Sequence, residues 1–107
     1  MSALTFVVES EGPTPRVALA GDLDIDSAPQ LKEALIALHG SGATGFTLEL
    51  SRLAFIDSTG LGTLVAVWNA LGNPAGGIRL VRPTASVARA FAITGLAEVF
   101  PTLSDPS

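Results

Sequence analysis

The chain of 107 residues contains no cysteine and a single histidine. Without cysteine it can form neither a disulfide framework nor a thiolate metal site. His39 cannot supply a metal site by itself. We therefore predict that the protein holds no metal ion and no cofactor.

Charged residues are also few, at 15% of the chain, and the six Lys and Arg residues are scattered. A formal net charge of −4 with no basic patch argues against nucleic-acid binding. No apolar run reaches the length of a transmembrane helix, and the first residues lack the basic start of a signal peptide. We expect a cytoplasmic domain that binds neither nucleic acid nor membrane.

The composition does favour a folded core, because 48% of the residues are hydrophobic. A chain of this length fits one domain. We predict a single domain over residues 1–107, with its core at about 4–100 and a polar, frayed C-terminal tail at 101–107.

Short segments rich in β-forming residues alternate with segments of helical periodicity. Strands are predicted at 4–8, 16–20, 46–50 and 78–81, and helices at about 27–39, 58–71 and 84–94, with a final turn near 96–100. The first two strands are close enough for an antiparallel hairpin, and the later alternation predicts parallel pairings with right-handed crossovers. The predicted fold class is α/β: a four-stranded mixed sheet, three main helices and a short C-terminal helix.

The segment Phe-Ile-Asp-Ser-Thr-Gly-Leu-Gly at residues 55–62 is the most informative in the chain. Two large apolar residues give way to small and polar ones, and then an apolar pattern with helical spacing begins. This predicts a strand or loop that leads straight into a helix N-terminus. Asp57 and Ser58 are both candidate N-caps, because a short side-chain oxygen can accept hydrogen bonds from free N–H groups.

Two glycines in the first turn of this helix, Gly60 and Gly62, need an explanation. Glycine inside a helix costs roughly 1 kcal/mol relative to alanine. Either these residues pack closely inside the fold, or something outside approaches their backbone. A hydroxyl at such a helix start also suits a phosphate, because the free N–H groups and the helix dipole favour an anion there.

Acidic and apolar residues alternate in a second segment, Gly21-Asp22-Leu23-Asp24-Ile25-Asp26. It is either a solvated loop that leaves a strand edge or an acidic border of a binding site. Its aspartate spacing begins like that of an EF-hand, but the glycine and terminal glutamate of that loop are missing.

Several residues predict how the helices begin and end. Ser27 is a plausible N-cap, with Gln30 completing a capping box, and Thr84 is a probable cap of the third helix. His39 lies near a helix C-terminus and is most simply a structural residue. Trp68 is expected to be at least partly buried.

The predicted topology brings the two unusual segments together. Both follow parallel strands and open helices, so both loops leave the sheet at the same edge. We therefore predict that Asp22, Asp24 and Ser58 share one surface.

The motif Asp57-Ser58-Thr59-Gly60-Leu61-Gly62, preceded by Phe55-Ile56, resembles the signature of the STAS domain family, specifically of bacterial anti-sigma factor antagonists. The resemblance extends from Leu4 to about Phe100. Weaker blocks support it, at Gly21–Asp24 with Ser27–Pro29, at Arg79–Val81, and at Thr94–Leu96.

The resemblance implies a partner-switching protein. Such antagonists bind an anti-sigma factor that is also a serine/threonine kinase and thereby free a sigma factor. The kinase phosphorylates a serine in the motif, which ends binding, and a serine phosphatase restores it. By position the phosphoacceptor is Ser58, and the implied partner-binding residues are Asp22, Asp24, Asp57, Ser58, Thr59, Gly60, Leu61 and Gly62.

One position departs mildly from the family pattern, which often has Glu where this chain has Asp22. The substitution shortens the acidic side chain but keeps its charge. We expect a monomer or weak dimer that is not an enzyme.

Two other functions remain open. A hydrolase with Ser58 as nucleophile needs a base within hydrogen-bond reach, and His39, the only histidine, closes a helix on the opposite side of the predicted fold. A STAS module without kinase regulation, such as a scaffold, a lipid-transport component or a nucleotide-binding sensor, is the stronger alternative.

Overall fold

The computed structural model describes residues 3–10 and 12–103. The elements in chain order are β1 (Thr5–Val8), β2 (Arg16–Leu23), α1 (Ala28–Gly40), β3 (Phe46–Ile56), α2 (Ser58–Ala70), β4 (Ile78–Val81), α3 (Ala85–Ile93), the 3-10 turn η1 (Leu96–Glu98) and β5 (Thr102–Leu103). The predicted α/β class and its three main helices are confirmed, with helix ends within one residue of the predicted ones. Strands β2 and β3 extend beyond their predicted ends.

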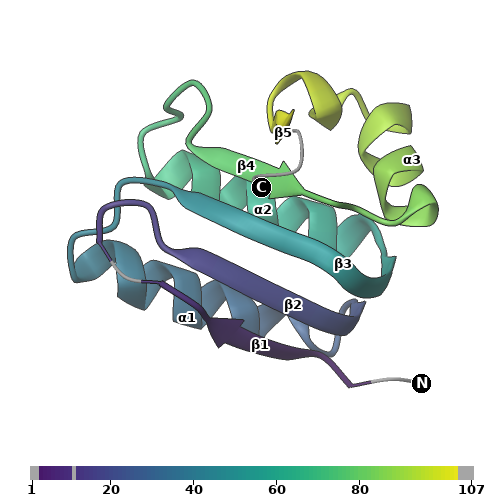
Figure 1. Cartoon of the computed structure of the whole chain (residues 1–107), viewed down its shortest axis with the longest axis horizontal. Coiled ribbons are helices and arrows are strands. Elements are labelled where there is room, and N and C mark those ends of the chain that lie inside the picture. The colour runs from purple at the N-terminus through teal and green to yellow at the C-terminus, as the bar shows by residue number, and fades with distance from the viewer. Residues whose placement is uncertain (1–2, 11, 104–107) are drawn as a thin grey trace.

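The sheet has the strand order β1-β2-β3-β4-β5, so each strand pairs with the next one along the chain. β1 runs antiparallel to β2, and the pairs β2–β3 and β3–β4 are parallel, as predicted. The pair β4–β5, which was not predicted, is parallel as well. Because the strands are added in one direction through right-handed crossovers, the connecting helices fall on one side. Figure 1 shows α1 and α2 together behind the sheet, with its other face turned to the viewer.

The four predicted strands are joined by a short fifth one. Thr102–Leu103 pairs in parallel with Leu80 and Val81 of β4. This part of the predicted C-terminal tail is therefore a strand, while residues 104–107 lie outside the described residues.

The core fills the space between the sheet and the helices. Trp68 is half-buried, as predicted, and its indole N–H donates to the Pro74 carbonyl at 2.9 Å. Its ring meets that of Phe100 edge-on at a centroid distance of 5.9 Å. The largest fully buried side chains are Phe46, Phe91, Phe100, Leu19, Leu23, Leu31, Leu35, Leu48, Leu50, Leu53, Leu64 and Ile78.

The second half of β3 is irregular, and this irregularity positions the end of the strand. The pairing with β2 shifts register twice, between Ala18 and Ala20 and between Gly21 and Asp22. Each shift places an extra β3 residue opposite β2, which is the mark of a bulge. The core-facing residues therefore follow a spacing of three, at Leu50, Leu53 and Ile56.

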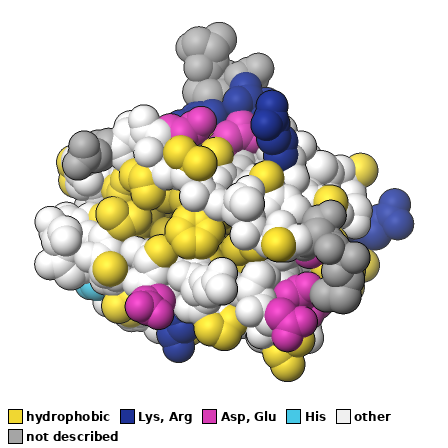
Figure 2. Space-filling view, turned by 90° about the horizontal axis from the view of Figure 1, so that it is seen from below, with side chains coloured by type: hydrophobic (Ala, Val, Ile, Leu, Met, Phe, Trp, Pro, Cys, Tyr) yellow, Lys and Arg dark blue, Asp and Glu magenta, His cyan; other side chains and the backbone are white. Residues whose placement is uncertain are grey.

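Hydrophobic side chains are exposed at the free edge of β1. Figure 2, seen from below the view of Figure 1, shows hydrophobic side chains gathered in the middle of this face, with acidic and basic side chains toward its borders. Val7 and Val8 of β1 are both among the exposed large hydrophobic residues.

Candidate functional site

The start of α2 lies directly after the end of β3 and is formed by the predicted motif. Asp57, with an extended backbone (φ −108°, ψ −176°), is the N-cap, and its Oδ1 accepts from the Gly60 N–H at 2.9 Å. Ser58 is the first helical residue, and both Ser58 and Thr59 are exposed. The N-cap is therefore Asp57, which leaves the Ser58 hydroxyl at the surface of the first turn.

Gly60 explains why the helix can sit so close to the sheet. A Cβ at this position would lie 2.7 Å from the Leu23 carbonyl oxygen and 2.9 Å from side-chain atoms of Leu23 and Ile56. The Asp57 N–H donates to the same carbonyl at 3.2 Å. The ends of β2 and β3 and the start of α2 thus form one tight joint, to which only glycine at position 60 is suited.

Gly62 has no such role. It is exposed, and a Cβ built on it meets nothing within 4 Å. Of the two explanations for the glycines, close packing applies to Gly60 only. Gly62 therefore lowers the stability of the helix by about 1 kcal/mol relative to alanine, and no internal contact explains why glycine is present.

The acidic segment lies beside this joint, as the topology predicts. Asp22 is aligned with Phe55, and Leu23 with Ile56, in the parallel pairing of β2 and β3. Asp22 is half-buried. Residues 21–23 belong to β2, so the segment is partly strand and only its second half is a loop.

Asp24 differs from the prediction that it lies exposed on this surface, because it is only 9% exposed. Its Oδ1 accepts from the N–H groups of Asp26 and Ser27 at 3.0 and 3.1 Å, and the Ser27 hydroxyl lies 3.2 Å away. The predicted capping box at Ser27 is also wrong. The Ser27 hydroxyl donates to the Asp22 carbonyl at 2.8 Å and forms no cap bond to α1, since it closes the preceding turn instead.

Two other residues implied as partner-binding, Gly60 and Leu61, are buried as well. Leu61 belongs to the hydrophobic core, with 7% exposure. Together with Asp24 they shape the joint from inside. The exposed or half-exposed members of the implied set are Asp22, Asp57, Ser58, Thr59 and Gly62.

Sequence analysis did not single out two large apolar side chains at this end of the sheet. Ile25 is 68% exposed in the turn after β2, and Phe55 is 47% exposed near the end of β3. An isoleucine between two aspartates was a usable signal for Ile25. Phe55 was noted only as one of the two large apolar residues that precede the motif, and the bulge beside it is what turns it outward.

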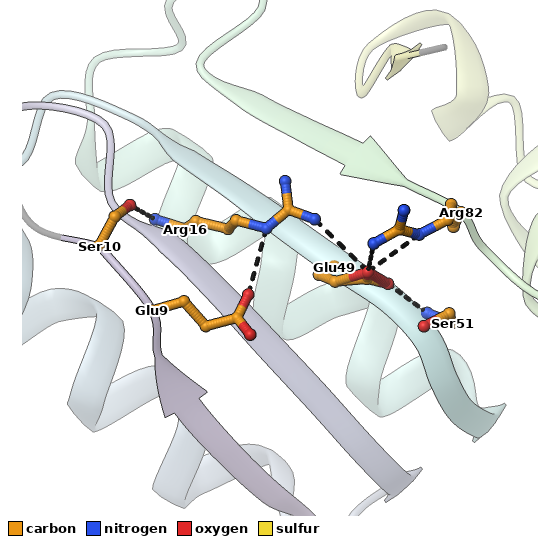
Figure 3. Close-up of polar contacts among 6 residues, drawn as sticks. All are labelled: Glu9, Ser10, Arg16, Glu49, Ser51 and Arg82. Atoms are coloured by element: carbon orange, nitrogen blue, oxygen red, sulfur yellow. Dashed lines mark hydrogen bonds and ion pairs between the residues drawn. The ribbon is translucent and has the colours of Figure 1, made fainter. Parts of the chain in front are cut away.

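The open face of the sheet holds an ionic network, shown in Figure 3. Glu49 on β3 accepts from Arg82, which follows β4, with the Arg82 Nε at 3.1 Å, and lies 3.5 Å from Arg16 Nη2 on β2. Arg16 Nε also donates to Glu9 at 3.1 Å. The network joins three neighbouring strands.

Glu49 is 7% exposed, and its environment decides its charge. Burial raises the pKa of the Glu49 carboxyl, but the Ser51 N–H and the Arg82 guanidinium outweigh this effect and hold the pKa below its ordinary value. Arg82 has a left-handed backbone (φ 51°), which is rare for a residue with a side chain. Glu49 is accordingly ionised at neutral pH.

The geometry does not support a hydrolase. The Nδ1 atom of His39 lies 2.7 Å from the Ala43 carbonyl, where α1 ends before β3 begins. Ser58 lies beyond the other end of β3, so an 11-residue strand at about 3.3 Å per residue separates it from this histidine. His39 is therefore too far from Ser58 to act as its base.

Within residues 3–10 and 12–103, no group of three or more His, Asp or Glu side chains is arranged to hold a metal ion. The same part of the chain has no helix with both the length and the apolar character needed to cross a membrane.

Comparisons with known proteins agree with this architecture. The model of a family described as Mlab, STAS domain matches residues 6–103. The anti-sigma-B factor antagonist of Bacillus subtilis is 34% identical over 84 residues, covering 78% of this chain and 76% of the relative.

Solved structures give the same result. An anti-sigma factor antagonist from Mycobacterium paratuberculosis has a TM-score of 0.81 and 28% identity, over 98% of this chain and 87% of that one. The anti-sigma factor antagonist SpoIIAA, in its unphosphorylated form, has a TM-score of 0.82 over 96% of this chain and 90% of that one. At 24% identity it shows the shared fold alone. By family model, relatives and fold, the chain belongs to the STAS domain family.

Proposed function

We propose that the protein is an anti-sigma factor antagonist: it binds an anti-sigma factor that is also a serine kinase, and phosphorylation of Ser58 ends the binding. The observation that carries this proposal is the exposed Ser58 hydroxyl at the first position of α2, directly after the capping Asp57. The curated relative named as an anti-sigma-B factor antagonist supports it. Acting on such a partner, the protein would work in the cytoplasm.

The joint beneath Ser58 suits a switch that changes a surface without unfolding the domain. Asp57 already satisfies the Gly60 N–H, and the Leu23 carbonyl holds the Asp57 N–H. These bonds do not involve the Ser58 hydroxyl. A phosphate added there leaves the joint intact and changes only what a partner meets.

The charge change is large enough to break a contact. Phosphorylation adds nearly two negative charges at pH 7. A carboxylate at a distance of about 6 Å from the phosphate would repel each unit charge by about 3 kcal/mol at an effective dielectric near 20. The helix N-terminus offsets about 0.3–1 kcal/mol. Because 1.4 kcal/mol corresponds to about a tenfold change in affinity, burying such a phosphate beside the acidic groups of this surface costs enough to end binding.

The test is phosphorylation by the purified anti-sigma factor kinase of the same bacterium with ATP, followed by mass spectrometry. We expect phosphate on Ser58, none on Ser58→Ala, and unchanged binding of the unphosphorylated Ser58→Ala variant. Ser58→Asp, which adds one negative charge, should bind at least tenfold more weakly.

Thr59 is the matched control, because it is also exposed and points about 100° away around the helix. Thr59→Ala should be phosphorylated normally. Phosphate on Thr59 alone, or normal labelling of Ser58→Ala, would refute the assignment of Ser58.

A second candidate is a STAS scaffold or sensor, lipid-transport-associated or nucleotide-binding, that no kinase regulates. The observation that favours this candidate is the matching family model, which is described as Mlab, STAS domain and does not carry the name of the antagonists. This candidate predicts that the anti-sigma factor kinase neither binds nor phosphorylates the parent protein.

A further inference from the structure

Gly62 is the residue from which the inference starts. It lies on the exposed side of α2, four residues and therefore about 6 Å along the helix from Ser58. Its φ is not in the left-handed region, and no atom lies within 4 Å of a Cβ built there. Because glycine weakens a helix and nothing inside the domain requires it here, the explanation that remains is a contact made from outside.

Two large apolar side chains are exposed at the same end of the sheet. Phe55 precedes Ser58 by three residues and is aligned with Asp22. Ile25 follows Asp22 by three residues, in the turn that Asp24 closes. A single exposed apolar residue is normal, but two that border one joint are the kind of anchors that dominate binding at protein interfaces.

The charges around these anchors have one sign. Asp22, Asp26 and Asp57 belong to the two segments that meet at the joint, while residues 17–31 and 53–78 contain no Lys or Arg. A partner surface of positive potential would therefore be attracted to this end of the molecule and oriented on it.

We propose that Ile25, Phe55 and Gly62 form one docking surface around Ser58. The partner that binds there is a protein with an apolar pocket flanked by Lys or Arg side chains. In the complex, part of this partner lies in van der Waals contact with Gly62. The proposal rests on the proposed function and gives the chemistry of the surface that the anti-sigma factor presents. The phosphate opposes such a contact by its size, because Ser58 lies in sequence between Phe55 and Gly62 and an added group there keeps the partner from reaching Gly62.

The decisive variant is Gly62→Ala, because the proposal predicts opposite effects on stability and on binding. The melting temperature of the free domain should rise by about 4 °C, since alanine favours the helix. The affinity of the unphosphorylated variant for the purified anti-sigma factor of the same bacterium, measured by calorimetry, should fall at least tenfold. Gly40→Ala is the matched control: Gly40 is also an exposed helical glycine with nothing within 4 Å of its Cβ position, but it ends α1. It should leave affinity unchanged.

The anchors are tested in the same assay. Phe55→Ser and Ile25→Ser should each weaken binding at least tenfold, whereas Ile93→Ser, which alters a residue 76% exposed at the end of α3, should change it less than twofold. Raising the salt concentration should slow association of the parent.

The possible failures can be told apart. A parent domain that does not bind the anti-sigma factor overturns the proposed function, and with it this inference. A parent that binds while Gly62→Ala and Phe55→Ser bind equally well overturns the docking surface alone. A loss of stability in Gly62→Ala, or a change of self-association by Phe55→Ser in sedimentation with no change in partner binding, also contradicts it.

Discussion

Replacing Glu49 with glutamine tests whether the ionic network on the open face stabilises the sheet through charge. The side chain of Glu49 is 8% exposed, and it accepts from Arg82 and from the Ser51 N–H at 2.7 Å. Hydrogen bonds to charged groups contribute about 1.5–3 kcal/mol each, but Arg82 is 45% exposed, which screens its share. We expect Glu49→Gln to lose about 2 kcal/mol at pH 7, or about 8 °C in melting temperature.

The pH dependence separates charge from packing. The pKa of Glu49 is lowered by folding, so its stabilisation is complete above the unfolded pKa and is lost as the pH falls through the lower, folded pKa. The difference between parent and Glu49→Gln should therefore be largest near pH 7 and shrink below about pH 4, near the ordinary pKa of a glutamate.

Urea denaturation of both proteins from pH 7 to pH 3 measures this difference. Glu9→Gln is the control, because Glu9 pairs with Arg16 at an exposed position (45%) and such pairs contribute about 0–1 kcal/mol. A difference between parent and Glu49→Gln that stays constant across this range would show that shape, and not charge, accounts for the loss.

Two further predictions concern the joint below Ser58. Gly60→Ala should destabilise the domain by about 1–2 kcal/mol in chemical denaturation, because the added Cβ would meet the Leu23 carbonyl at 2.7 Å and overpacking outweighs the gain in helix propensity. A Gly60→Ala variant that is more stable than the parent would show that α2 can shift away from the sheet to make room for the added Cβ. Asp24→Ala should cost about 1–2 kcal/mol by removing the acceptor of the turn, whereas Asp24→Asn keeps an acceptor oxygen and should melt within about 2 °C of the parent. Equal melting temperatures for Asp24→Ala and the parent would show that the hydrogen bonds of Asp24 do not stabilise this turn.

Most of the architecture was predictable because its signals are local. Helical spacing, capping residues and glycine stops located α1, α2 and α3 to within a residue, and Thr84 does cap α3, accepting from the Val87 N–H at 3.3 Å. The alternation of elements then gave the parallel pairings. The position of Asp22 beside the motif followed from topology alone.

The features that sequence analysis missed depend on pairing between distant segments. β3 was predicted to end at Leu50 because the two-residue alternation ends there, but the two register shifts against β2 change the spacing and continue the strand to Ile56. The burial of Asp24 depends on a turn whose hydrogen bonds compete with the expected capping box at Ser27. β5 has two residues and forms only because β4 offers a free edge.

The sequential strand order has a consequence for how the protein folds during synthesis. No strand has to insert between two strands that are already paired, since each pairs with an edge formed by the strand before it. A chain that leaves the ribosome N-terminus first can therefore add its strands one at a time, without a trapped intermediate that must reopen. The bonds of the Ser58 joint all lie within residues 23–61. The surface that we propose as the switch thus needs no hydrogen bond from β4, α3 or β5.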